Sequence, residues 1–249
     1  MTEHVRTSQD GAVAVIRLAR PEKKNALTRA MYQAMAQALA AAEADPSIHV
    51  ILLAGGADFT AGNDIADFAA PRDEGPGAAF DFLEAMVAAT KPVVAAVRGA
   101  AVGIGTTLLL HCDVVVASET ARLLMPFTRL ALVPEAGSSL LLPARVGPAL
   151  ANWWLLSAAP FSGVEAQRAG LASRAVPDDE VEAAAMEMAF HLAGLPPGAV
   201  QDSKRLIRAP HRAALATAMA AERDAFSARL RSPEAQAAFA GFLARKAPG

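Results

Sequence analysis

The chain of 249 residues has a single cysteine, almost no net charge and no long apolar run. Because Cys112 cannot form an intrachain disulfide, the sequence favours a reducing compartment. The formal net charge of −2 argues against a strongly electrostatic fit to nucleic acid. The longest uncharged run lies between Arg145 and Glu165, where Pro148 and Pro160 interrupt it, so no membrane span is predicted.

Several motifs that would indicate a reaction class are also missing. There is no G-x-S-x-G, which argues against a serine hydrolase. Gly103-Ile104-Gly105 begins like a dinucleotide fingerprint, but Leu108 replaces the third glycine, and no Gly-Lys-Ser/Thr follows to make a Walker loop. No group of His, Cys, Asp and Glu has metal-ligand spacing. With no secretory signal and no peroxisomal address in view, we expect a cytoplasmic protein without a metal.

Strand and helix patterns alternate along most of the chain. Apolar strand signals at 13–18 and 50–53 flank an Ala-rich helix that Thr28 would cap and that would end near Ala44. This order predicts an α/β fold with parallel crossovers. From about residue 196 the pattern is wholly helical. We therefore predict a core at residues 1–195 and a helical C-terminal region at residues 196–249.

A glycine-rich turn between two buried strands, within residues 91–139, organises the sequence. The turn contains Gly99, Gly103 and Gly105, and a short apolar helix to His111 follows it. Glycines at such a turn let backbone N–H groups approach a ligand closely, and the helix N-terminus adds positive potential. One interpretation is a site that stabilises negative charge on an oxygen. The other is that the glycines only permit close helix–strand packing, and the residue types support both equally.

Two acidic residues lie in segments that could contribute chemistry. Glu135 follows Pro134 within an apolar loop, where its pKa would be raised into the range of a general base; a solvated loop glutamate is the equal alternative. Asp64 follows the Ala61-Gly62-Asn63 turn and is interpreted as the cap of a short helix. For Asn63, the backbone N–H rather than the side chain is the group that would hold an oxyanion.

The remaining charged and aromatic clusters favour structural interpretations. A basic run near residue 208 is interpreted as a solvated helix face, with contact to a coenzyme A phosphate or to RNA as alternatives. The pair Trp153-Trp154 is interpreted as core or subunit interface. The basic run comprises Lys204, Arg205, Arg208, His211 and Arg212.

Together, these segments resemble the crotonase family, the enoyl-CoA hydratase/isomerase superfamily, over nearly the whole chain. The matching segments are Lys24-Asn25-Ala26-Leu27, residues 59–65, 91–118 and 161–171, and a terminal stretch at 239–246. The resemblance implies a ββα spiral core, a C-terminal helical region that builds trimers or dimers of trimers, and acyl-CoA thioester substrates with no further cofactor.

The resemblance also implies roles for individual residues. The backbone N–H groups of Asn63 and Ile104 would hold the thioester oxygen. Phe239 and Lys246 would close the adenine end of the coenzyme A channel, from the same or a neighbouring subunit. The other residues implied to contact the substrate are Lys24, Asn25, Ala26, Ala61, Gly62, Asp64, Ile65, Gly103 and Phe127.

Two departures from the family pattern narrow the predicted reaction. Where the family's hydratases carry two glutamates, this chain has Thr107 and Phe127. Glu135 instead matches the single glutamate of the Δ3,Δ2-enoyl-CoA isomerase branch. We therefore predict conversion of 3-enoyl-CoA to 2-enoyl-CoA through an enolate, with Glu135 as proton shuttle. Alternatives are enoyl-CoA hydration, epoxide or ring isomerisation of an aryl-CoA, and a non-catalytic homologue that binds CoA thioesters or RNA.

Overall fold

The computed structural model describes residues 2–69 and 77–246, apart from the side chains at 68, 69, 243, 245 and 246. The sequence also predicts a charged loop rich in glycine and proline at residues 72–77, and this loop lies outside the described residues except for Gly77. Along the described part of the chain, no helix combines the length and the apolarity that a bilayer crossing requires.

A six-stranded sheet forms the centre of the molecule, with strand order β1-β2-β3-β4-β6-β9. Strand β1 is antiparallel to β2 and every other pair is parallel, so the predicted crossovers are confirmed. A smaller sheet has the order β5-β7-β8. The strands are β1 (Val5–Asp10), β2 (Val13–Leu18), β3 (Val50–Ala54), β4 (Val93–Val97), β5 (Ala100–Val102), β6 (Val114–Ser118), β7 (Arg122–Leu124), β8 (Phe161–Ser162) and β9 (Arg174–Val176).

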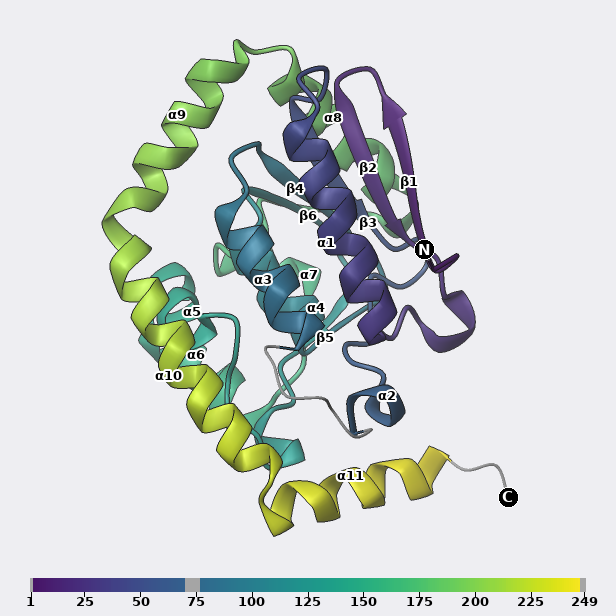
Figure 1. The fold of residues 1–249 in the computed structure, drawn as a ribbon, viewed down its shortest axis with the longest axis vertical. Helices are drawn as coiled ribbons and strands as arrows, with labels where there is room; N and C mark the ends of the chain where they lie inside the picture. The colour runs from purple at the N-terminus through teal and green to yellow at the C-terminus, as the bar shows by residue number, and fades with distance from the viewer. Residues whose placement is uncertain (1, 70–76, 247–249) are drawn as a thin grey trace.

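Helices cover both faces of the larger sheet (Figure 1). Helices α1 and α3 pack side by side on one face, and α8 lies on the other against β3, β4 and β6. The helices are α1 (Arg29–Ala44), α2 (Ile65–Ala69), α3 (Ala78–Ala88), α4 (Ile104–Thr107), α5 (Ser138–Val146), α6 (Pro148–Ser157), α7 (Gly163–Arg168), α8 (Val181–Ala193), α9 (Pro197–Arg208), α10 (Arg212–Leu230) and α11 (Pro233–Lys246). Short 3-10 helices are η1 (Pro21–Lys23), η2 (Leu108–His111), η3 (Thr128–Leu130), η4 (Asp178–Glu180) and η5 (Ala209–His211).

Because both sheet faces are covered, the central strands are apolar on both sides. Val94 and Ala96 of β4 face α8 in one apolar cluster, whereas Val93, Ala95 and Val97 belong to the larger cluster beneath α1 and α3. This alternation explains why the sequence shows continuous apolar runs at 50–54 and 93–97 rather than an alternating pattern.

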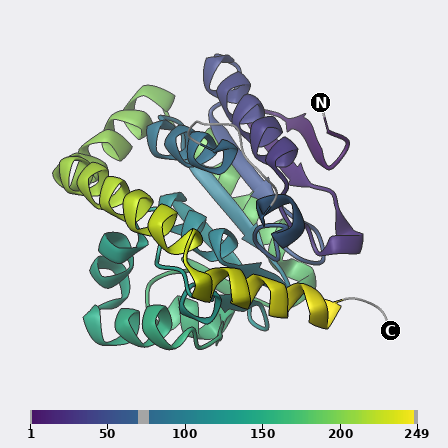
Figure 2. The ribbon, with the colours of Figure 1, turned by 60° about the horizontal axis from the view of Figure 1, so that its bottom comes forward.

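The C-terminal helices run along one edge of the molecule, and α11 then turns back across its lower end (Figures 1 and 2). Helix α9 is tied to the core by Asp113, whose carboxylate lies 2.8 Å from Lys204 Nζ and 2.8 Å from Arg208 Nη2. Lys204 is buried and also donates to the Lys91 carbonyl at 2.7 Å. The interpretation of the basic run as a solvated face is thus wrong for Lys204, which is an anchor.

The sequence also contains two further capping signals, a capping box at Ser162 and Glu165 and a cap at Asp178 for the helix that follows it. The signals at Thr28 and Ser162 are confirmed, and the one at Asp178 is wrong. The Thr28 side chain accepts a hydrogen bond from Met31 N at 3.3 Å, and Ser162 with Glu165 forms a capping box. Asp178, expected to cap the next long helix, instead begins η4 and accepts a hydrogen bond from Arg98 Nε at 3.0 Å. The nearby guanidinium competes successfully for this carboxylate, which a local pattern cannot reveal.

Candidate active site

A cavity of about 1210 Å³ opens between the core and the C-terminal helices. Its wall is built from the chain before and within α1, the turn before α2, the start of α3, the glycine-rich turn before α4, the 124–135 segment, and α10 with α11. The structure thus brings together most residues that the sequence singled out. On the wall are Lys24, Ala26, Ala61, Gly62, Asn63, Asp64, Ile65, Gly103, Ile104, Phe127, Glu135 and Phe239.

Two glycine turns lie against each other at the centre of this wall. Gly62 has a φ of +84°, and a Cβ added there would lie 2.6 Å from the Val102 carbonyl oxygen. A Cβ added at Gly105 would lie 2.6 Å from the Thr60 Cγ2. The glycines therefore do permit close packing, as one interpretation held, and that packing brings the backbone of Asn63 close to the turn before Ile104.

The backbone N–H of Asn63 is not used in a hydrogen bond within the described protein. The carbonyl of its peptide, Gly62 O, accepts from Leu27 N at 2.8 Å. Because the peptide is trans, the N–H points in the opposite direction. No acceptor among the described residues receives it, and Asn63 lines the cavity.

The Ile104 N–H is arranged in the same way. Ile104 is the first residue of α4, so its N–H has no partner within the helix. The carbonyl of its peptide, Gly103 O, accepts from Thr106 N at 2.9 Å and from Thr107 N at 3.0 Å. Two backbone donors without acceptors in the described protein thus border one cavity, which is the composition of an oxyanion site.

Glu135 supplies a carboxylate to the same wall. The Thr107 hydroxyl donates a hydrogen bond to Oε1, while Oε2 accepts none from the residues that the structure describes. Burial raises the pKa of Glu135 to about 8; the Thr107 hydrogen bond lowers it, and the charge of Glu222 raises it. A carboxylate with this pKa and one free oxygen is suited to accept and return a proton near neutral pH.

The loop after Glu135 is held from two directions. Ala136 and Gly137 both have positive φ, 59° and 70°. The His111 Nε2 lies 2.7 Å from the Ala136 carbonyl, which can only accept, so this nitrogen carries a proton. Burial lowers the pKa of His111 to about 4, so the ring is neutral at pH 7.

Glu222 of α10 holds the loop from the other side. Its carboxylate accepts from Gly137 N at 2.6 Å and from Ser139 N at 2.9 Å, so it caps the start of α5. Sequence reasoning missed both His111 and Glu222 as supports of this loop. They lie 25 and 85 residues from their partners, and no local spacing signals such a contact.

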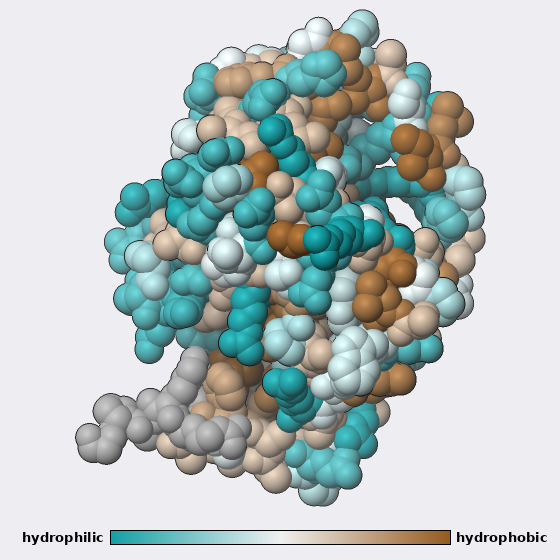
Figure 3. All heavy atoms as spheres, turned by 180° about the vertical axis from the view of Figure 1, so that it is seen from behind, coloured by the Kyte–Doolittle hydropathy of each residue, from teal (hydrophilic) through white to brown (hydrophobic). Residues whose placement is uncertain are grey.

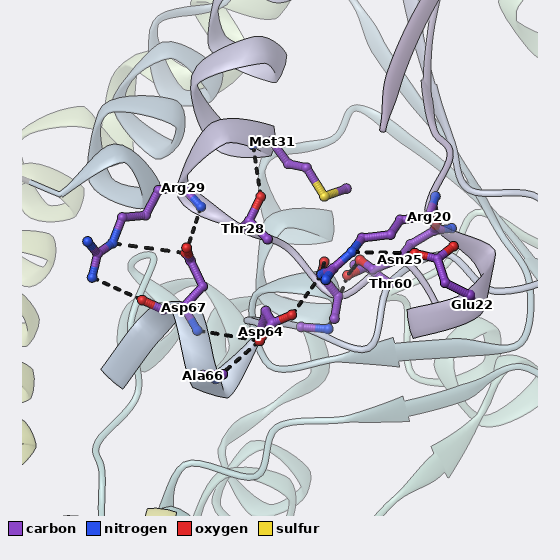
Figure 4. Close-up of polar contacts among 12 residues, drawn as sticks. Arg20, Glu22, Asn25, Thr28, Arg29, Met31, Thr60, Asp64, Ala66 and Asp67 are labelled. Atoms are coloured by element: carbon purple, nitrogen blue, oxygen red, sulfur yellow. Dashed lines mark hydrogen bonds and ion pairs between the residues drawn. The ribbon is translucent and has the colours of Figure 1, made fainter. Parts of the chain in front are cut away.

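Three further carboxylates on the cavity wall are paired with arginines (Figure 4). Asp64 lies 2.8 Å from Arg20 Nη1 and also accepts from Ala66 N at 3.1 Å, which confirms its interpretation as a helix cap. Glu22 lies 3.6 Å from Arg20 Nε. Asp67 accepts from the backbone N–H of Arg29 at 2.8 Å and lies 4.0 Å from its Nε. Glu135 is the one carboxylate on the described wall without a recorded cationic partner.

Asn25 does not lie on the cavity wall, so the prediction that it contacts the substrate does not match its place in the structure. It is almost fully buried, and its amide Nδ2 donates to the Gly55 carbonyl at 2.6 Å and to the Asp58 carbonyl at 2.7 Å. Its Oδ1 accepts from Arg20 N at 2.7 Å. Asn25 therefore cross-links the loops that support the wall.

Aromatic side chains from the two C-terminal helices complete the cavity. Phe239 lies on the wall of its own chain's cavity and is buried. The Lys246 side chain lies outside the described residues. The aromatic residues of the wall are Tyr32, Phe80, Phe127, Phe226, Phe239 and Phe242.

The largely parallel sheet, the two apposed glycine turns and the C-terminal helices agree with the crotonase class of enzymes that the sequence resembles. The family model for enoyl-CoA hydratase/isomerase matches residues 8–249, and the chain belongs to this family. The predicted fold and family are thereby confirmed. Among the described residues, no group of His, Cys, Asp and Glu is placed to hold a metal ion.

Proteins that are similar to this chain are named for different reactions. The chain is 34% identical to the 2,3-dehydroadipyl-CoA hydratase of Escherichia coli over 97% of its own length and 96% of that protein. It is also 34% identical to the human enoyl-CoA delta isomerase 2, over 96% of its own length and 63% of that protein. Among solved structures, OdaA of Pseudomonas aeruginosa is 47% identical with a TM-score of 0.94, covering 97% of this chain and 99% of that one.

Proposed function

We propose that this enzyme of the enoyl-CoA hydratase/isomerase family moves a double bond, converting 3-enoyl-CoA to 2-enoyl-CoA. The observation that carries the proposal is that Glu135 is the one carboxylate of the described wall without a recorded cationic partner. Since the chain is equally identical to a named hydratase and a named isomerase, identity does not decide between the two reactions.

The proposed mechanism uses the three groups on the wall in sequence. The N–H groups of Asn63 and Ile104 donate to the thioester oxygen. The free Oε2 of Glu135 takes a proton from C2, and the resulting dienolate places its negative charge on that oxygen. Glu135 then returns the proton at C4, so one carboxylate serves both steps. Each oxyanion donor is worth about 2.7–4 kcal/mol of barrier in comparable sites.

Hydration by the route of the family's hydratases requires two carboxylates, which act together as acid and base when water adds to the double bond. At the two positions where the sequence pattern places hydratase glutamates, the chain has Thr107 and Phe127, and neither ionises. The Thr107 hydroxyl instead donates a hydrogen bond to Glu135 Oε1. This substitution supports isomerisation over hydration.

The positive side chains of the wall support a thioester of coenzyme A as the ligand. Lys23, Lys24, Arg29 and Arg129 border the cavity, and phosphate groups favour such surroundings. We propose that Lys24 and the neighbouring Ala26 and Ala61 line the coenzyme A channel. The absence of a further cofactor and the cytoplasmic location stay predictions from the sequence.

We further propose that the protein forms a homotrimer or a dimer of trimers. Large apolar side chains are exposed on two helices: Trp153 and Leu156 of α6, and Leu206 and Ile207 of α9, the last with 73% of its surface accessible. Figure 3 shows hydrophobic residues at the surface on the side along which α9 runs. Sedimentation of wild type against Ile207→Asp tests this, because a charge at a buried interface weakens assembly.

A substrate panel followed by mass spectrometry tests the proposed reaction. Purified protein is incubated with 3-enoyl-CoA and, separately, with 2-enoyl-CoA thioesters of several lengths. We expect 3-enoyl-CoA to give a product of unchanged mass with the conjugated absorbance of a 2-enoyl thioester. A product heavier by one water, formed at a comparable rate, would show that the enzyme is a hydratase. Binding of thioesters or retention of RNA without turnover would support a non-catalytic homologue.

A further inference from the structure

The only tyrosine of the chain, Tyr32, lies on the wall of the cavity. It sits in the first turns of α1 and is 3% exposed. Its ring packs against Phe82 with centroids 6.0 Å apart and an interplanar angle of 46°. The ring thus belongs to the core, while the hydroxyl contacts Asn63 on the cavity wall.

The Tyr32 hydroxyl donates a hydrogen bond to Asn63 Oδ1 at 2.5 Å. This is the side-chain hydrogen bond of Asn63 within the described residues. The backbone N–H of Asn63 has no acceptor there. Both neighbours are bound to Leu27: Gly62 O accepts from Leu27 N at 2.8 Å, and Asp64 N donates to Leu27 O at 2.9 Å. Residue 63 is therefore fixed from one side by the backbone and from the other by Tyr32.

The two attachments of residue 63 restrict the direction in which its backbone N–H points. The preceding residue is a glycine at positive φ, which gives the turn more conformational freedom than any other residue would. An oxyanion donor contributes fully only when it is held in place before the charge develops. A second attachment at the Asn63 side chain restricts rotation of the turn.

We propose that Tyr32 is a positioning residue for the Asn63 donor, and this proposal rests on the isomerase function proposed above. By occupying Asn63 Oδ1, the Tyr32 hydroxyl fixes the turn with the backbone N–H toward the thioester oxygen. It also leaves the two Nδ2 hydrogens of Asn63 without an acceptor in the described protein.

The surroundings of Tyr32 keep it protonated, as a donor must be. Burial raises its pKa well above the usual value, and the charges of Glu135 and Asp67 raise it further. The other charged side chains on the cavity wall are Glu22, Lys23, Lys24, Arg29, Asp64 and Arg129. The negative charge of ionised Glu135 therefore helps to keep the Tyr32 hydroxyl protonated.

Tyr32→Phe tests the role because it removes the hydroxyl and keeps the ring. We expect kcat for 3-enoyl-CoA to fall roughly 3- to 10-fold, the effect of one neutral hydrogen bond, with KM changed by less than about 2-fold. Ser118→Ala, which removes a buried hydroxyl away from the cavity wall, is the matched control and should keep the wild-type kcat. Wild-type kcat in Tyr32→Phe would overturn the proposal.

Asn63→Ala, which keeps the backbone N–H, completes a double-mutant cycle. If Tyr32 acts through Asn63, Tyr32→Phe should have little further effect in the Asn63→Ala background. A full additional loss in that background would show that Tyr32 acts elsewhere and overturn the proposal.

Titration of the single tyrosine by tyrosinate absorbance gives a readout that does not depend on turnover. Loss of the Asn63 acceptor should let Tyr32 ionise at lower pH in Asn63→Ala than in wild type, since the hydrogen bond stabilises the neutral phenol. An identical titration in both proteins would overturn the contact. If wild type fails to isomerise 3-enoyl-CoA while the titration shifts as expected, the proposed function fails and the Tyr32–Asn63 contact stands.

Discussion

The Thr107 hydroxyl donates a hydrogen bond to Glu135 Oε1, at the position where the family pattern places a glutamate in hydratases. A neutral donor thus stands where a second acid would stand. The contact holds Oε1 of Glu135, a residue of the cavity wall, and Oε2 accepts no hydrogen bond from the described residues. This relationship links the sequence departure to the proposed reaction.

Thr107→Val removes the donor and keeps the side-chain shape. Because the Thr107 hydrogen bond lowers the pKa of Glu135, its loss should raise that pKa above about 8. The pH profile of kcat/KM rises as Glu135 loses its proton, so the midpoint of the rise should move to higher pH. Thr107→Ser, which keeps a hydroxyl, should remain close to wild type. An unchanged midpoint in Thr107→Val, or an equal shift in both variants, would contradict this role.

Glu222→Gln removes a charge that acts on the base from the C-terminal helices. Since the Glu222 charge raises the pKa of Glu135, the midpoint of the pH–rate profile should move to lower pH. The loss of a charged acceptor for Gly137 N and Ser139 N should also destabilise the fold by about 1–3 kcal/mol in denaturant unfolding. Glu234→Gln, an exposed carboxylate on α11, is the control for both measurements. A midpoint that stays at the wild-type value would show that Glu222 has no influence on the base.

The stability of the wild type relative to Glu135→Gln should depend on pH. The folded pKa of Glu135 is about 8, above the ordinary value of 4.5, so the folded state binds more protons than the unfolded state between these values. The free energy of unfolding contributed by this group is therefore fully present below pH 4.5 and is lost as pH rises through 8. The difference between the two proteins should fall by up to about 1.4 kcal/mol per pH unit. A constant difference would mean that the pKa of Glu135 is not raised.

Asp113→Asn should weaken the attachment of α9 to the core and destabilise the fold. Lys204 is buried, and loss of its partner leaves an unpaired charge, which costs roughly 3–5 kcal/mol of unfolding free energy. Asp202→Asn breaks an exposed pair with Arg205 and should cost less than about 1 kcal/mol. Similar losses in the two variants, measured by denaturant unfolding, would contradict the anchoring role of Asp113.

The contacts that the sequence predicts correctly are mostly local. Thr28, Ser162 and Asp64 cap helices through partners at most three residues away, so short patterns reveal them. The Gly62 and Gly103 turns are recognisable from the glycines themselves. Glu135 is recognisable because it is a single acidic residue within an apolar segment. The roles of these residues in catalysis remain proposals, as does the boundary at residue 195.

What the sequence could not give depends on distant parts of the chain. The contacts of Glu222 with Gly137 and of Lys204 with Asp113 join segments 85 and 91 residues apart in the sequence. Strands β5, β8 and β9 are only two or three residues long, too short for a periodic pattern. The family pattern implies that Asn25 contacts the ligand, whereas in the structure its buried side chain cross-links loops that are distant in the sequence.

The rate of 3-enoyl-CoA isomerisation by Glu135→Gln tests the central claim most directly. The variant keeps the shape of the side chain and removes the base, while Glu119→Gln, an exposed carboxylate beyond β6, is the matched control. We predict a loss of roughly 10²–10⁴-fold in kcat for Glu135→Gln and none for Glu119→Gln. A wild-type rate in Glu135→Gln would show that another group moves the proton.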